Sequence, residues 1–99
     1  MEFLILAYDG TDNGAPERRL AHRPAHLETI ARLVAEGRIF YGAAILDDSD
    51  RMMGTVLVGN FPSRAEMDAW LKAEPYVTGG VWKKIDVQPC KTGPAFLKK

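Results

Sequence analysis

Residues 2–10 read EFLILAYDG, a continuous apolar run that stops at Asp9 and Gly10. An apolar run of this length followed by a turn signal is typical of a β-strand that is buried on both faces. The run therefore predicts a strand with two apolar sides. The remaining elements determine what covers each side.

The next predicted element is a helix over residues 24–36, where apolar side chains recur at helical spacing. Gly37 stands where a C-cap glycine belongs, and Pro24 suits the first helical turn. Residues 11–16 are rich in turn formers and predict a surface loop. Residues 17–23 would form either a separate helical turn or a kinked lead-in, because proline inside one long helix breaks a hydrogen bond.

A hairpin is predicted from two β-rich runs, residues 38–46 and 52–58, which flank an acidic turn. A last strand is predicted over residues 81–88, where Val81, Ile85 and Val87 alternate with Trp82 and polar residues before Pro89. These runs give three strands after the first helix.

A capping box marks the second helix, since Ser63 is followed three residues later by Glu66. Pro75 stops this helix. The predicted order is βαββαβ, the ferredoxin-like α+β arrangement, in which two helices cover one face of a four-stranded antiparallel sheet.

Two helices leave the other face of such a sheet open. Because residues 2–8 and 52–58 are apolar on both sides, that face would form a large exposed apolar patch. We expect a two-fold homodimer, a dimeric α+β barrel, to bury it. Residues 91–99 show no periodicity and are expected to form a C-terminal arm, which could lie across the interface.

Composition limits the possible partners and location. The 99 residues fit a single domain, 1–99. Lys+Arg and Asp+Glu both number 13, so we expect neither nucleic acid nor membrane as a partner. The apolar run of residues 3–7 is far below the ~20 residues that span a bilayer. The single cysteine, Cys90, excludes an internal disulfide and favours a cytoplasmic protein.

His26 is the residue on which we expect any chemistry to centre. On a helical wheel it falls between Ile30 and Leu33, so its ring should point toward the sheet. A lone histidine on an apolar face is more often structural, so its position alone does not decide its role. His22, four residues earlier, adds only one further ligand where zinc needs three or four, and we expect no metal site.

Four further residues are candidates for the same site. Arg19 and Arg23 precede the predicted helix and could orient an anionic or carboxylate substrate by forked hydrogen bonds, or be a solvated basic lead-in. Tyr8 and Asp9 close the first strand and could reach a cleft or cap a turn.

Several short motifs, taken together, resemble the YCII family. They are RPAHL at residues 23–27, EGR at 36–38, EPYV at 74–77 and GVW at 80–82. The resemblance implies a ferredoxin-like dimer, similar in fold to muconolactone isomerase, with a His–Asp pair in a cleft as the active site. The matching histidine is His26, and Glu74 stands where the family typically has aspartate.

The resemblance also implies dehydrochlorinase-like or lyase-like activity on ring-derived substrates, without a cofactor. A semi-buried imidazole can accept a proton while a carboxylate on its other nitrogen fixes the tautomer. Glu74 is favoured as that carboxylate by its motif, with Asp9 second, and Tyr76 in the same motif joins the candidate substrate contacts. The first hypothesis is therefore an acid/base enzyme for elimination, isomerisation or lyase chemistry on a small ring-derived or carboxylate substrate.

The alternative is a non-catalytic dimeric module that binds a small molecule or a partner. In that hypothesis His26 only hydrogen-bonds a ligand or the core. A carboxylate within hydrogen-bond reach of His26 in an accessible cleft would favour the enzyme, whereas bonds to backbone alone would favour the module.

Overall fold

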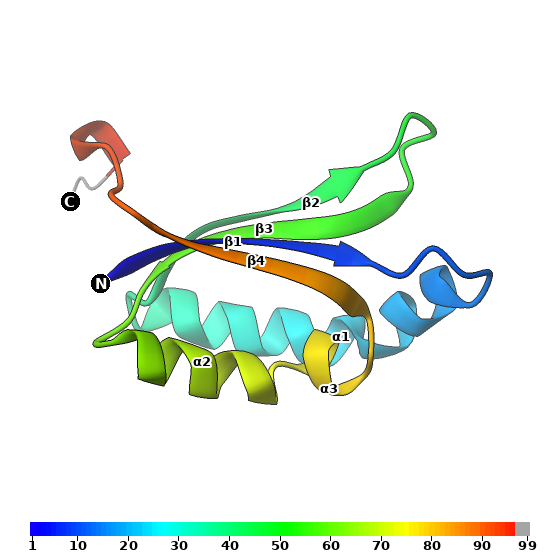
Figure 1. Ribbon diagram of the computed structural model, residues 1–99, viewed down its shortest axis with the longest axis horizontal. Coiled ribbons are helices and arrows are strands. Elements are labelled where there is room, and N and C mark those ends of the chain that lie inside the picture. The colour runs from blue at the N-terminus through cyan, green and yellow to red at the C-terminus, as the bar shows by residue number, and fades with distance from the viewer. Residues whose placement is uncertain (97–99) are drawn as a thin grey trace.

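The computed structural model of the chain describes residues 1–96 and has the predicted ferredoxin-like α+β fold (Figure 1). The elements in chain order are β1 (Glu2–Asp9), α1 (Ala15–Ala35), β2 (Ile39–Leu46), β3 (Met52–Asn60), α2 (Arg64–Ala73), α3 (Pro75–Thr78), β4 (Trp82–Cys90) and a 3-10 turn (Pro94–Phe96). The strands form one antiparallel sheet in the order β2-β3-β1-β4. All three helices lie on the same face of this sheet (Figure 1).

Strand β1 shows how the sheet divides its two faces. Phe3, Ile5 and Ala7 are fully buried in the core beneath the helices. Full burial of a large apolar side chain contributes roughly 1.5–3 kcal/mol. The side chains of Leu4 and Leu6 alternate with them and are only half-buried on the open face. The predicted apolar open face is therefore present.

Helix α1 is longer than the sequence predicts. It runs from Ala15 through Pro24 to Ala35, so Pro16 and not Pro24 occupies its first turn. Residues 17–23 are therefore part of the same helix, and the alternative of a separate helical turn was wrong. A proline in the interior of a helix costs about 3 kcal/mol of stability. The Pro24 ring lies on the exposed side of α1, and the helix buries residues both before and after Pro24. Those residues share one stripe and are seven apart, namely Arg19, His26 and Leu33.

The second helix ends as predicted and is followed by a short extra one. The Ser63 Oγ accepts a hydrogen bond from the Glu66 backbone N–H at 3.1 Å, which confirms the N-cap of α2. Pro75 stops α2, and it also opens α3, a four-residue helix that the sequence did not predict. Glu74 lies between the two helices with an extended backbone and caps α3.

Strand β4 departs from the predicted alternation at its start. The pairing with β1 shifts between Tyr8 and Asp9, which is a local irregularity of the bulge type. As a result Trp82 is buried in the core, together with half-buried Ile85 and Val87. The strand also continues through Pro89, which an edge strand tolerates.

The predicted C-terminal arm is described only in part. Residues 91–96 leave β4 and contain the 3-10 turn, and residues 97–99 lie outside the described residues. Over residues 1–96, no helix has both the length and the apolar content that crossing a membrane requires.

Candidate active site

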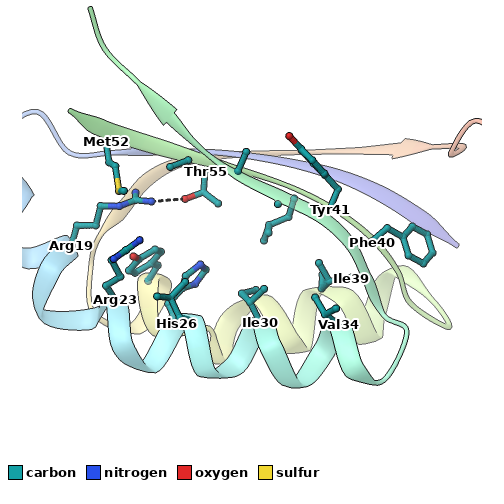
Figure 2. Close-up of a pocket in the computed structure, with 16 residues that line it drawn as sticks. Arg19, Arg23, His26, Ile30, Val34, Ile39, Phe40, Tyr41, Met52 and Thr55 are labelled. Carbon is teal, nitrogen blue, oxygen red and sulfur yellow. Dashed lines mark hydrogen bonds between the residues drawn. The ribbon is translucent and has the colours of Figure 1, made fainter. Parts of the chain in front are cut away.

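A cavity of about 450 Å³ opens between helix α1 and the strands β2 and β3. This volume lies within the range of ligand-binding pockets, about 300–1,000 Å³. Its two ends differ in chemistry (Figure 2). Arg19, Arg23, His26 and Thr55 lie at one end, and apolar side chains such as Ile30 and Ile39 line the other.

His26 and Glu74 form a buried pair at the polar end. The His26 Nδ1 atom lies 2.8 Å from the Glu74 Oε1 atom, and the two side chains are 7% and 0% exposed. The same Oε1 accepts the Tyr76 backbone N–H at 2.8 Å. Because an ionised carboxylate only accepts hydrogen bonds, Nδ1 is the donor in this contact, and in the neutral imidazole Nε2 then carries the lone pair. Within residues 1–96, Nε2 has no hydrogen-bond partner.

Two aromatic side chains fix the orientation of the imidazole. The Tyr76 ring stacks on it at 4.0 Å between centroids with an angle of 12°. The Trp82 ring meets it edge-on at 5.8 Å. Such contacts stabilise beyond their burial alone and leave the ring little freedom. His26 is therefore held in one orientation by a carboxylate and two rings.

Asp9 pairs with Arg19 and not with His26, for which it was the second candidate carboxylate. Both of its carboxylate oxygens lie 3.0 Å from the Arg19 Nη1 atom. The Arg19 Nη2 atom donates to the Thr55 Oγ1 at 3.1 Å, the dashed contact in Figure 2. The two buried carboxylates therefore have different partners. Glu74 pairs with His26, and Asp9 neutralises the charge of Arg19.

Three other residues of interest fall in different places. Arg23 lines the cavity between Arg19 and His26 (Figure 2). Tyr8 does not line it, because strand alternation turns its side chain to the open face of the sheet. His22 packs instead on Gly79, where a Cβ atom would lie 2.5 Å from its ring.

Sequence reasoning missed two residues that shape the site. Thr55 sits within a run of strand formers and carries no motif of its own. Regular alternation would place Trp82 on the opposite face of the strand from Ile85 and Val87, and only the shifted pairing of β4 brings it to His26. Within the described part of the chain, no three side chains of His, Cys, Asp or Glu type cluster closely enough to hold a metal ion.

Comparison with known proteins places the chain in a family. The model of the YCII-related domain matches residues 1–91. The chain belongs to the YCII family. The YciI proteins of Escherichia coli O6:H1 and Shigella flexneri are each 34% identical to it over 97 residues, which cover 92% of this chain and 97% of theirs. A Haemophilus influenzae protein is 31% identical over the same share.

Solved structures extend the YCII comparison to a characterised enzyme. The 5-chloro-2-hydroxyhydroquinone dehydrochlorinase TftG of Burkholderia phenoliruptrix AC1100, in complex with 2,5-dihydroxybenzoquinone, matches with a TM-score of 0.81 and 26% identity. The match covers 96% of this chain and 98% of TftG. An antibiotic biosynthesis monooxygenase matches with a TM-score of 0.55 and 16% identity over 95% of this chain and all of that one, which shows the shared fold alone.

Proposed function

We propose that this chain is a cofactor-independent enzyme in which His26 is the general base for elimination, isomerisation or lyase chemistry on a small ring-derived molecule. The observation that carries the proposal is the 2.8 Å contact between His26 Nδ1 and buried Glu74 at the wall of the cavity. A carboxylate on Nδ1 keeps Nε2 available as a base and stabilises the imidazolium that forms. The likeness to TftG supports a hydroxylated ring as substrate and elimination as the first reaction to test.

The elimination requires one proton acceptor and a leaving group. The reacting form would be the keto tautomer of the ring, in which the carbon that bears the leaving group is tetrahedral. His26 Nε2 would take a hydroxyl proton from it, and the electron pair of the broken O–H bond would form a carbonyl and shift the ring double bond toward that carbon. The leaving group would depart with its own bonding pair as an anion, which for a chlorinated ring is chloride. The imidazolium, stabilised by Glu74, then returns its proton to solvent. The net reaction is loss of one proton and one anion from the substrate, so it needs no oxidant or reductant.

The proposal is tested by chloride release from 5-chloro-2-hydroxyhydroquinone, followed by ion chromatography with dialysed protein in the presence of a chelator. We expect release in proportion to protein concentration and faster than in buffer. Release at the buffer rate would contradict elimination. If 2,5-dihydroxybenzoquinone nevertheless bound in the cavity, the non-catalytic binding module would be the better description.

Substitution of Glu74 tests how the carboxylate orients His26. Glu74→Gln keeps the length of the side chain but removes the charge and offers an amide that can favour the wrong tautomer. We expect kcat/KM to fall by roughly 10²–10⁴-fold. Glu74→Asp withdraws the carboxylate by about 1–1.5 Å, and a misplacement on that scale can cost about 10²-fold.

The matched control for these variants is Glu28→Gln, because Glu28 is an exposed residue of α1 that does not line the cavity. It should keep wild-type activity. Wild-type kcat/KM in Glu74→Gln would mean that the carboxylate only caps α3. The assays are steady-state rates on one substrate at one pH.

We also propose that the chain is a single domain that works as a homodimer through the open face of its sheet. The support is the half-buried apolar face of β1 and β3, extended by Tyr41 of β2, which is 61% exposed. Exposed apolar patches of this kind mark interaction surfaces. Light scattering at micromolar concentration should give twice the 11.0 kDa mass of one chain. A mass of one chain would contradict the dimer.

A further inference from the structure

The hydroxyl group of Tyr76 is buried without a partner. Tyr76 is fully buried and lines the cavity. Its Oη atom makes no hydrogen bond to any atom of residues 1–96. Burial of an unpaired hydroxyl costs free energy, and nearly all buried polar groups in proteins have a partner. Phenylalanine would fill the same space without this cost, so packing does not explain the hydroxyl.

The Tyr76 ring is held firmly, which fixes the position of its hydroxyl. The imidazole of His26 stacks on the ring at 4.0 Å. The Arg19 guanidinium carbon lies 4.9 Å from the ring centroid, and the Tyr76 backbone N–H is bound by Glu74. A donor that is fixed before the ligand arrives costs no reorganisation on binding. The same contacts hold the Tyr76 ring against the imidazole.

Arg23 brings a positive charge to this end of the cavity. The charge of Arg19 is neutralised by Asp9 at 3.0 Å. Arg23 also points into the cavity (Figure 2), and among the described residues it takes part in no ion pair. Burial raises the pKa of the Tyr76 phenol, although the charges of Arg19 and Arg23 oppose this. The phenol therefore stays protonated near neutral pH and can donate a hydrogen bond.

We propose that the Tyr76 hydroxyl and the Arg23 guanidinium form a subsite for the anionic oxygen of a planar ring, a phenolate or an enolate. The apolar side chains of Leu27, Ile30 and Ile39 farther along the cavity would contact the ring itself. In catalysis the two donors would stabilise charge that develops on that oxygen while His26 takes the proton. This part of the inference rests on the proposed function, whereas binding of the oxygen does not.

The subsite can be tested with 4-nitrophenol, whose absorbance reports its ionisation. A subsite with two donors favours the bound nitrophenolate, so the apparent pKa of the bound probe should fall below its value in buffer. A merely apolar pocket would raise it. Tyr76→Phe and Arg23→Gln should each weaken nitrophenolate binding by about tenfold, the usual effect of a hydrogen bond to a charged group. Binding of the neutral isostere 4-nitrotoluene should change by less than about twofold.

Two controls separate a binding role from a structural one. Tyr8→Phe removes a hydroxyl from the other face of the sheet and should bind both probes as wild type does. Tyr76→Phe should unfold at the wild-type temperature or above it, because the hydroxyl removed has no protein partner. Wild-type nitrophenolate affinity in Tyr76→Phe would overturn the subsite. A fall of several degrees in its unfolding temperature would do so too, since it would reveal a structural partner.

The outcome for the subsite and the outcome for the enzyme can be read separately. A wild-type protein that prefers nitrophenolate but releases no chloride would support the subsite and contradict the proposed function. If the wild-type protein released chloride but Tyr76→Phe bound nitrophenolate as tightly as wild type, the function would be supported and the subsite overturned.

Discussion

His26→Asn is expected to lower kcat/KM by about 10²–10⁴-fold, the usual contribution of a positioned general base. Asparagine can place an amide N–H near the position of Nδ1, so the contact with Glu74 has a replacement. It has no counterpart of Nε2, the atom that faces the cavity without a protein partner among the described residues. The variant therefore removes the proposed base and keeps most of its surroundings. Chloride release from 5-chloro-2-hydroxyhydroquinone measures the effect.

The loss should appear in kcat more than in KM, because His26 acts on the proton in the transition state. His22→Asn is the matched control. His22 lies four residues earlier on α1 and packs on Gly79 outside the cavity, so its variant should keep full turnover. If His26→Asn retained more than a tenth of wild-type kcat/KM, the general-base role would be wrong.

Asp9→Asn is expected to lower the free energy of unfolding by about 3–5 kcal/mol, because it leaves the buried charge of Arg19 uncompensated. The two side chains are only 6% and 5% exposed, and Arg19 also reaches Thr55. In a domain of this size each kcal/mol corresponds to about 4–8 °C, so Tm should fall by more than about 10 °C. Urea unfolding and calorimetry both measure the change.

A double substitution and a surface control show whether the loss in Asp9→Asn comes from an unpaired buried charge. Replacing both partners, Asp9→Leu with Arg19→Met, removes the unpaired charge and should recover much of the lost stability. The exposed pair of Arg64 and Asp68 is the control, and Asp68→Asn should cost less than about 1 kcal/mol. A loss below about 1 kcal/mol in Asp9→Asn would show that the buried pair contributes little.

The order of elements could be predicted because each has a strong local signal. The apolar run of β1, the acidic turn of the hairpin and the Ser63 cap are all short-range patterns, and the structure confirms them. Helix α1 could not be predicted in full. Its passage through Pro24 depends on the burial of Arg19 and His26 by distant strands, a tertiary effect that overrides local preference.

The candidate site was predictable to a similar extent. His26 and Glu74 follow from the family motifs, and the structure brings them together at 2.8 Å. The pairing of Asp9 with Arg19 depends on how α1 packs over β1. No local sequence pattern predicts that packing. The placement of Tyr8 was available from the sequence, because the alternation that turns Ala7 inward turns Tyr8 outward.

The most direct test of the role of His26 is a crystal structure of this protein with 2,5-dihydroxybenzoquinone. We predict that the ring occupies the cavity between α1 and the strands β2 and β3, with one of its atoms about 3 Å from His26 Nε2. An oxygen of the ring should lie against Tyr76 and Arg23. A ligand on the open face of the sheet with the cavity unfilled, or a His26 whose Nε2 is bonded to a protein carbonyl, would contradict the general-base assignment.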